Sequence, residues 1–566
     1  MKSILRTLIV CTGLAAGSQC LAVEKPNVLF IALDDLNDWV GCLGGHPQAK
    51  TPNLDRLAAS GVLFDNAHCP APACNPSRSA IFTGISPHVS GMYTNGQDMR
   101  LVMPNAELIP KYFSRHGYWS GGSGKMLHYF IDARSWDEYY PKKETENPFP
   151  PHIDFGKRPK SLPRGGPWQY VETDWHGFEV SDDEFGGDSK VADYVSKQLQ
   201  REHDQPFFLA CGIYRPHEPW FVPQKYFDQF PLDQVQLPPG YKENDLDDLS
   251  AYAQKVGKNR YFAHIREQGQ WKRGVQAYLA SITYADAMLG RVLDALEKSP
   301  NRDNTIVVLW SDHGWHLGEK QHWQKFTMWR ASTRVPLIMR VPQGVPGLPK
   351  GTEPGGRCSR PVNLVSLFST LTELSGLPPQ GSQEPSLVPL LKDPSANWPH
   401  ASITYHHDPG TYGISGEGWR YIHYADGSEE LYDIGADPYE WENLVGKAEH
   451  EKKLIEMRAK APSKLAKKVI ADESLPKLEF QVGAGPASKP DGSKFSVLFI
   501  NKTGKPVELF WNDLKGKPVS YGMIGPGEKR KQQTRPGAVW QLKIEGEGEA
   551  RGHAVVGDRA ARVIVR

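Results

Sequence analysis

The sequence predicts an α/β fold in which a largely parallel sheet lies between helices, followed by a smaller α+β subdomain and a small all-β sandwich module. The main evidence is three apolar, β-branched runs, which begin at Asn27, Phe207 and Thr305. Uninterrupted apolar strands are buried on both faces, which is typical of parallel sheets covered by helices. Helical candidates lie between these runs at residues 51–61 and 275–299, so the order of elements is that of an α/β protein.

A polar cluster follows each of the three runs. Asp34 and Asp35 follow the first run, His217 follows the second, and Asp312 and His313 follow the third. In open α/β sheets, ligands bind beyond the carboxyl ends of the strands. We therefore expect these side chains to meet at one edge of the sheet. An isolated pair such as Asp34 and Asp35 could equally cap a helix or a turn.

The composition and the expected secondary structure change twice in the later part of the chain. From about residue 340 there are Pro/Gly-rich loops, a helix candidate at 363–376 and short strand-like pieces within 418–434, which indicate the smaller subdomain. Short alternating strands at 495–501, 506–512 and 537–546 indicate the all-β module. The predicted units are listed in chain order: a signal segment 1–22, a catalytic domain 23–340, a subdomain 341–470, a linker 471–492 and a β-sandwich 493–566.

The composition limits the possible partners. The 66 basic and 65 acidic residues nearly cancel, so no field of the whole protein favours nucleic acid or an anionic membrane, and we expect no nucleic-acid partner. Lys2 and Arg6 precede an apolar run that is too short to span a bilayer, and small residues end at Ala22. This layout predicts an exported, periplasmic or extracellular protein without a stable membrane anchor.

The segment "CPAPACNPSRSAIFTG", residues 69–84, places Cys74 near the start of a helix. Proline is favoured at the first helical position, so we expect the helix to begin at Pro76 with Cys74 just before it. Free N–H groups make a helix start an anion site, and Arg78 adds a planar fork suited to an oxyanion. Cys69 has no such neighbours and is expected to be buried or in a disulfide.

"CNPSR" resembles the C-x-P-S-R signature of the type I sulfatases of the alkaline phosphatase superfamily, in which the cysteine is oxidised to formylglycine. Four further segments resemble that family in the expected order, and the resemblance covers roughly residues 25–460: they are "PNVLFIALDDLND", "TPNLDRLAASGVLFDNAHC", "GYWSGGSGKMLH" and "SDHGWHLGEKQHWQKF". The G-K-x-x-H of Gly124, Lys125 and His128 and the "RPHEPW" around His217 are most similar to the branch that includes iduronate-2-sulfatase.

The resemblance implies a metal site and a modified nucleophile. The ion would be held by Asp34, Asp35, Asp312, His313 and an oxygen of the modified Cys74. Three carboxylates favour calcium, and magnesium is the alternative. A formylglycine-generating or anaerobic sulfatase-maturating enzyme would be the partner that oxidises Cys74.

The resemblance also implies roles for the remaining residues. Arg78, Lys125 and Lys325 would neutralise charge on the sulfuryl oxygens, and Lys125, Lys325 and His217 would bind substrate. His217 would protonate the leaving alcohol, and His128 would help to eliminate sulfate from the hydrated aldehyde. Further possible substrate contacts, near these motifs or in the later subdomain, are His316, His322, His406 and His407.

The resemblance implies hydrolysis of sulfate esters of a carbohydrate. Two alternatives stay open: a phosphonate or phosphodiester hydrolase that uses the same cysteine, and an inactive protein that binds sulfated glycans. The sugar, the sulfate position, endo or exo action and the oligomeric state are not predicted. Loops such as 134–170 would decide the substrate.

The terminal module resembles the β domain of the von Hippel-Lindau protein, in which the corresponding surface binds a hydroxyproline peptide. Tyr521 and Trp540 match two residues of that pocket, whereas a histidine of the pattern falls on Ala538. Residues 493–566 contain 8 Lys and 6 Arg against 7 acidic residues, a surplus of seven positive charges. The module would either help to hold a sulfated polymer or serve as a solvated packing domain.

Overall fold

The computed structural model describes residues 25–128, 130–142, 159–163, 173–469, 475, 477–490, 495–535, 537–557 and 561–566. The predicted signal segment 1–22 and most of the loop 134–170 lie outside these residues. Within the described part, none of the helices combines the length and the apolar composition that a membrane crossing needs.

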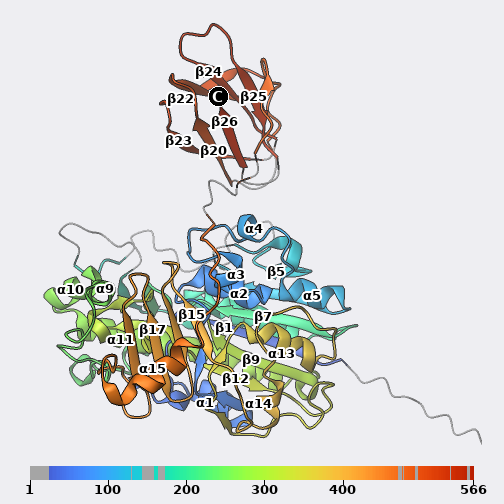
Figure 1. The fold of residues 1–566 in the computed structure, drawn as a ribbon. Helices are drawn as coiled ribbons and strands as arrows, with labels where there is room; N and C mark the ends of the chain where they lie inside the picture. Colours follow the sequence, from blue (N-terminus) through green and yellow to red (C-terminus); the bar gives the residue numbers. More distant parts are fainter. Residues whose placement is uncertain are drawn as a thin grey trace, which may run out of the picture.

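A mixed eight-stranded sheet forms the centre of the larger body (Figure 1), with the order β13-β2-β12-β9-β1-β7-β4-β5. The strands are β1 (Asn27–Leu33), β2 (Val62–Phe64), β4 (Trp119–Gly124), β5 (Glu138–Tyr140), β7 (Phe207–Ile213), β9 (Thr305–Ser311), β12 (Leu337–Arg340) and β13 (Gly356–Cys358). β1 pairs in parallel with both β7 and β9, while β12 runs antiparallel to β9. The predicted α/β fold is therefore confirmed, and the three predicted apolar runs are the three central strands.

Strand β1 explains why these runs are apolar throughout. Successive side chains of a strand point to opposite faces. Leu29, Ile31 and Leu33 belong to one hydrophobic cluster, whereas Val28, Phe30 and Ala32 belong to a second cluster on the other face. All six side chains are fully buried, so both faces of the sheet are covered.

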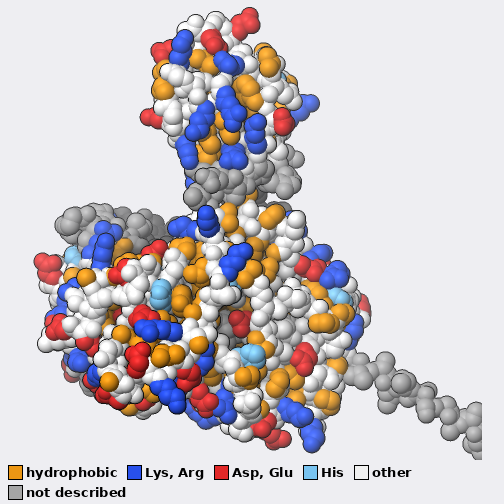
Figure 2. Space-filling model, viewed as in Figure 1, with side chains coloured by type: hydrophobic (Ala, Val, Ile, Leu, Met, Phe, Trp, Pro, Cys, Tyr) orange, Lys and Arg blue, Asp and Glu red, His pale blue; other side chains and the backbone are white. Residues whose placement is uncertain are grey.

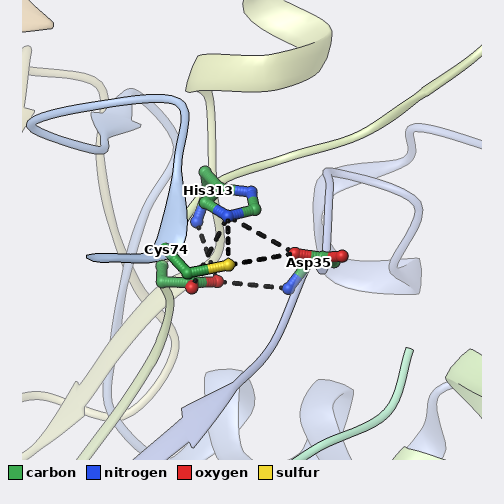
Figure 3. Close-up of side chains that lie close together, drawn as sticks. Asp35, Cys74 and His313 are labelled. Carbon is green, nitrogen blue, oxygen red and sulfur yellow. Dashed lines mark hydrogen bonds and ion pairs between the residues drawn. The ribbon is translucent and has the colours of Figure 1, made fainter. Parts of the chain in front are cut away.

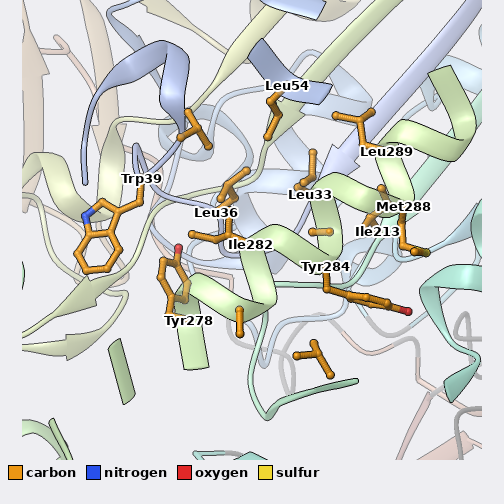
Figure 4. Packing of buried hydrophobic residues seen from close by; sticks show 14 of the residues in the cluster. Leu33, Leu36, Trp39, Leu54, Ile213, Tyr278, Ile282, Tyr284, Met288 and Leu289 are labelled. Atoms are coloured by element: carbon orange, nitrogen blue, oxygen red, sulfur yellow. The ribbon is translucent and has the colours of Figure 1, made fainter. Parts of the chain in front are cut away.

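Two groups of helices provide that cover. On one face lie α1 (Pro52–Ser60), α7 (Asp188–Gln200) and the long α11 (Trp271–Glu297), whose Tyr278, Ile282 and Met288 pack near Leu33 (Figure 4). On the other face lie α2 (Cys74–Thr83), α5 (Ile109–Arg115) and α13 (Ser366–Leu374). The central strands therefore end between two layers of helices. Residues that directly follow β1 and β9 are buried between the layers.

The smaller subdomain is built on a four-stranded antiparallel sheet with α15 (Glu451–Arg458). Its strands are β15 (Ser402–Tyr405), β16 (Tyr412–Ser415), β17 (Trp419–His423) and β18 (Glu429–Asp433). The chain between 341 and 400 still contributes β13 and α13 to the main core, so this stretch is not part of the smaller sheet. The boundary at 340 that the sequence predicts therefore divides elements that pack together.

The terminal module has its own core and forms a separate lobe (Figure 1), and Leu101 of the larger body packs against a small cluster that includes its Leu498 and Ile500. Two sheets face each other, in the orders β19-β25-β24-β21-β22 and β23-β20-β26. The strands are β19 (Gln481–Val482), β20 (Phe495–Asn501), β21 (Val507–Asn512), β22 (Pro518–Ile524), β23 (Lys529–Thr534), β24 (Val539–Ile544), β25 (Gly552–Val555) and β26 (Ala561–Val565). β19 lies within the predicted linker 471–492 and pairs with β25, so part of this linker belongs to the module.

Candidate active site

The site lies beyond the carboxyl ends of β1 and β9. These strands are neighbours, with Leu33 opposite Ser311, so the residues that follow them meet. The backbone N–H of Asp35 donates to Oδ1 of Asp312 at 3.1 Å. The polar clusters that follow two separate runs of the sequence thus form one cluster in the structure.

Asp35 has an unusual backbone conformation with a φ of 62°, a region that aspartate tolerates better than most residues. Tyr278 of α11 fixes this turn, because its hydroxyl donates to the carbonyl of Asp35 at 2.8 Å and accepts the N–H of Asn37 at 3.0 Å. Nothing in the sequence singles out Tyr278, because it lies in an apolar helical run and carries no motif.

Cys74 is the first residue of α2, with Ala73 before it at the cap position. The prediction that the helix begins at Pro76 was therefore wrong by two residues. Proline lacks only its N–H, and the N–H groups of the whole first turn have no partner within the helix, so Pro76 is tolerated as the third residue. The consequence is that Cys74 itself occupies the helix start, where free N–H groups favour an anion.

Three positive or ionisable groups approach the sulfur of Cys74. Nζ of Lys325 lies 3.1 Å from Sγ, Nε2 of His313 lies 3.3 Å away and Nζ of Lys125 lies 3.7 Å away. Asp35 is close on the same side, with Oδ1 at 4.0 Å (Figure 3). Burial alone would raise the pKa of the thiol, but the ammonium groups of Lys125 and Lys325 bring it well below its usual value. The site is therefore built to stabilise negative charge at residue 74.

The backbone of Lys125 lies against the end of β7, where Gly124 and Gly212 come close together. Its backbone N–H donates to the carbonyl of Gly212 at 3.0 Å, at the end of β7. A Cβ on Gly124 would lie 2.0 Å from that carbonyl oxygen, and Gly124 also has a φ of 74°. The glycines beside Lys125 are thus required by packing, and the side chain of Lys125 forms an ion pair with Asp34.

Arg78 is placed differently from the role that the resemblance implies. Its side chain is fully buried. Nε donates to Asp312 at 2.8 Å, one terminal nitrogen donates to Asp34 at 3.0 Å, and the other donates to the carbonyl of Lys125 at 2.6 Å. Arg78 therefore orients and neutralises the two carboxylates, and the described contacts do not direct it at a substrate.

His217 lies opposite Asp35, with 3.6 Å between Nε2 and Oδ2. Its Nδ1–H donates to the carbonyl of Glu218 at 2.7 Å. Burial lowers the pKa of this imidazole, but the carboxylates of Asp35 and Asp34 outweigh burial and the pKa is raised. His217 thus lies buried beside the carboxylate cluster.

His128 is half-buried near Cys74, with which its side chain forms a hydrogen bond. Burial lowers the pKa of His128. The pKa values of His128 and His217 are thus shifted in opposite directions.

A family model described as sulfatase matches residues 26–377, and a second, described as the C-terminal part of N-sulphoglucosamine sulphohydrolase, matches residues 318–467. The chain belongs to the sulfatase family. It is a sulfuric ester hydrolase with an alkaline-phosphatase-like core, as the sequence predicted. Neither match extends past residue 467, so the terminal module is an addition to the matched regions.

Relatives and solved structures agree with this assignment. A sulfatase of Formosa agariphila is 39% identical over 455 residues, which are 78% of this chain and 87% of that protein. Iduronate 2-sulfatase of Homo sapiens is 30% identical over 401 residues, 65% of this chain and 72% of that protein. The structure of BT4656 with D-glucosamine-2-N,6-O-disulfate has a TM-score of 0.59 at 23% identity, and covers 77% of this chain and 96% of its own. Phosphonate monoester hydrolase of Agrobacterium radiobacter has a TM-score of 0.60 at 22% identity with the same coverage, so these two structures speak for the fold alone.

The carboxylates of the sulfatase site suit a divalent cation. Asp35, Cys74, Asp312 and His313 offer ligand atoms that lie within 4.8 Å of one another, and Asp34, Asp35 and His217 form a second such group. Oδ2 of Asp35 is buried and has no hydrogen-bond partner. Burial raises the pKa of Asp35 despite the nearby cations, which means that its negative charge is incompletely compensated. A hard cation among these oxygens would supply the missing charge.

Three of the other candidate histidines bond the segment around Lys325. His316 bonds Thr327, His322 bonds the carbonyl of Lys325, and His406 bonds the carbonyl of Phe326. These three histidines hold the segment around Lys325 and are buried, whereas His407 is exposed. In the described residues Cys69 is a buried free thiol, as are Cys211 and Cys358, so no disulfide involves it there.

Proposed function

We propose that this sulfatase is exported and hydrolyses sulfate esters of a carbohydrate, with a formylglycine hydrate made from Cys74 as the nucleophile and a divalent cation beside it. The observation that carries the proposal is the surroundings of the Cys74 sulfur, where Lys125, Lys325 and His313 converge next to a buried carboxylate cluster. A site of this charge and size suits one sulfuryl group attached to residue 74.

The proposal requires oxidation of Cys74 by a maturation enzyme, either formylglycine-generating or anaerobic. The side chain of Cys74 is 0% exposed in the folded chain. A protein partner could not reach it there, so the modification would occur before α2 packs against its neighbours. The lowered pKa of the thiol agrees with a position that carries negative charge during the reaction.

Asp34, Asp35, Asp312 and His313 would hold the cation together with an oxygen of modified residue 74. The cation would supply positive charge that acidifies a hydroxyl of the aldehyde hydrate. Calcium fits an irregular set of carboxylate oxygens better than magnesium does. Arg78 would keep Asp34 and Asp312 in position through the contacts at 3.0 Å and 2.8 Å.

The chain's own groups would perform the remaining steps. Lys125 and Lys325 would bind the sulfuryl oxygens and stabilise their charge as the sulfur is attacked. His217, with its raised pKa, would protonate the leaving alcohol. His128, with its lowered pKa, would accept a proton from the second hydroxyl of residue 74, which expels sulfate and restores the aldehyde.

The carbohydrate part of the proposal is supported by the similar proteins. Human iduronate 2-sulfatase, which is 30% identical over the matched residues, is named for a sulfated sugar. The export part rests on the N-terminal segment 1–22. Desulfation of a panel of sulfated mono- and oligosaccharides tests the substrate class, and detection of the mature protein outside the cytoplasm tests export.

The rival activity is hydrolysis of phosphonate or phosphate diesters. A phosphonate monoester hydrolase has a similar fold, so the fold does not separate the two activities. Parallel assays with an aryl sulfate and an aryl phosphonate ester separate the two. The proposal predicts a higher kcat/KM for the sulfate, and a higher value for the phosphonate would reverse it. Absence of any hydrolysis, with Cys74 unmodified, would favour the inactive glycan-binding alternative.

A further inference from the structure

A pocket of about 420 Å³ opens on the terminal module, outside both family matches. It lies where two edge strands meet: β22 ends the five-stranded sheet and β23 ends the three-stranded sheet. The residues that line it and matter here are Trp511, Tyr521, Gln532, Gln533, Arg535 and Trp540. The lining residues that the structure describes include one cation and no carboxylate.

The aromatic side chains of the pocket are held in fixed positions. Trp511 of β21 is directly opposite Trp540 of β24. The indole N–H of Trp540 donates to the hydroxyl of Thr534 at 2.9 Å, and Tyr521 meets the Trp540 ring edge-on with 5.0 Å between centroids. Trp540 is 2% exposed, whereas Tyr521 is 40% exposed. An aromatic wall in which the Tyr521 ring is exposed and the Trp511 ring is partly exposed is suited to packing against a flat ligand that has C–H groups on its face.

Polar groups surround this wall. Gln532 and Gln533 of β23 bring amide groups that can both donate and accept hydrogen bonds. Arg535, directly after β23, is exposed and carries a guanidinium, whose planar fork matches a sulfate ester or a carboxylate. Apolar ring faces, amides and a cation in one pocket match the C–H faces, hydroxyls and anionic groups of a sulfated sugar.

Positive charge elsewhere on the module agrees with an anionic ligand. Lys529, Lys531 and Arg562 lie on one face of the three-stranded sheet, because Lys531 and Arg562 are both opposite Leu498 and Lys529 is two residues before Lys531. Figure 2 shows Lys and Arg gathered on the visible face of the module. The surplus of seven positive charges in residues 493–566 contrasts with the near balance of the whole chain. A positive surface attracts a polyanion over several ångströms.

We propose that this pocket binds a sulfated saccharide unit of the substrate polymer, with Tyr521 packed on a sugar ring and Arg535 paired with a sulfate. The inference rests on the proposed function, because it takes a sulfated carbohydrate to be the substrate. The module would keep the polymer attached while the catalytic site releases sulfate. A hydroxyproline peptide, the ligand of the von Hippel-Lindau β domain that the module resembles, is the competing occupant. Ala538 stands where the pocket of that domain has a histidine.

Binding is measured with the full-length chain carrying Cys74→Ala, so that no turnover intervenes. The probes are fluorescent oligosaccharides of chondroitin sulfate, heparin and carrageenan, each beside its chemically desulfated counterpart, and one proline-hydroxylated peptide. The pocket variants are Tyr521→Ala and Arg535→Gln. Their matched controls in the same module are Leu514→Ala and Lys515→Gln, which are exposed and outside the pocket.

We expect at least one sulfated probe to bind about tenfold more tightly than its desulfated form, and each pocket variant to weaken that binding about tenfold. The controls should stay within about twofold of the parent. Equal binding of sulfated and desulfated probes, unchanged binding by Tyr521→Ala, or preference for the hydroxylated peptide would overturn the inference. Hydrolysis of p-nitrophenyl sulfate by chains that retain Cys74 should be the same with and without the pocket substitutions. A parent chain without this hydrolysis would contradict the proposed function instead.

Discussion

The ammonium group of Lys325 lies 3.1 Å from the sulfur of Cys74 and 2.8 Å from a carboxylate oxygen of Asp35. The chain on both sides of Lys325 has positive φ values, 88° at Gln324 and 74° at Phe326. Such backbone is costly and persists where surrounding contacts enforce it. One such contact is the hydrogen bond from the N–H of Phe326 to the carbonyl of Pro72 at 3.1 Å, which ties this loop to the segment that carries Cys74.

Replacement of this ammonium should reduce the chemical step. Lys325→Met removes a positive group from the place where sulfuryl charge develops, so kcat/KM for an aryl sulfate should fall about 10²- to 10³-fold. Lys298→Met is the control, because Lys298 is exposed at the end of α11. Steady-state kinetics provide the measurement. A variant with the parental kcat and only a raised KM would show that Lys325 contributes to ground-state binding alone.

Arg78 should be essential to the structure of the site. Arg78→Met removes the buried guanidinium that Asp34 and Asp312 share, and the free energy of unfolding should fall by about 3 kcal/mol. Arg56→Met removes an exposed ion pair with Asp294 and should change it by less than about 1 kcal/mol. Urea denaturation compares the two. Similar small losses for both variants would contradict the positioning role.

Removal of the cation should stop the reaction reversibly. Oδ2 of Asp35 accepts no hydrogen bond, and burial raises the pKa of Asp35 despite the nearby cations, so the protein groups do not fully compensate its charge. EGTA followed by gel filtration should abolish aryl sulfate hydrolysis, and calcium should restore it at a lower concentration than magnesium. Asp312→Asn should raise the calcium concentration needed. Full activity in protein shown by elemental analysis to be metal-free would refute the metal site.

Asp286 should make stability depend on pH. This residue of α11 accepts the backbone N–H of Leu54 at 2.8 Å and that of Asn53 at 3.1 Å, which docks α1. Burial outweighs these bonds and raises the pKa of Asp286 from 3.8 to about 6. Because the folded state binds the proton more tightly, its contribution is present below about pH 4 and is lost as the pH rises through 6.

The predicted size of this loss is roughly 2 kcal/mol between pH 4 and 7. It should disappear from the pH dependence of unfolding in Asp286→Asn, whatever that substitution costs at a fixed pH. Urea midpoints of both proteins across this range give the comparison. Parallel pH profiles would contradict the raised pKa.

The sheet and its polar clusters could be predicted because each cluster directly follows an apolar strand. Asp34, Asp35 and Asp312 are brought together by the pairing of β1 with β9, which the parallel pattern implies. The glycines around Lys125 are also visible in the sequence. Gly124 and Gly212 are needed because the backbones at these two positions come close together. These features depend on local sequence and on strand order.

Other parts of the site depend on side-chain directions that the sequence does not encode locally. Whether Arg78 faces a substrate or two carboxylates is decided by where β1 and β9 end relative to α2. Tyr278 looks like any aromatic residue of a buried helix, although its hydroxyl holds the turn at Asp35. The start of α2 was misplaced because proline is compatible with several positions of a first turn.

The most direct test of the account is the chemical state of residue 74 in the active protein. Trypsin should release the segment from Leu57 to Arg78, which contains both Cys69 and Cys74. Fragment masses should place an aldehyde at residue 74 and an unaltered thiol at residue 69, and the modified fraction should rise in proportion to activity on aryl sulfate. A preparation that hydrolyses aryl sulfate at full rate while Cys74 keeps its thiol would contradict the account.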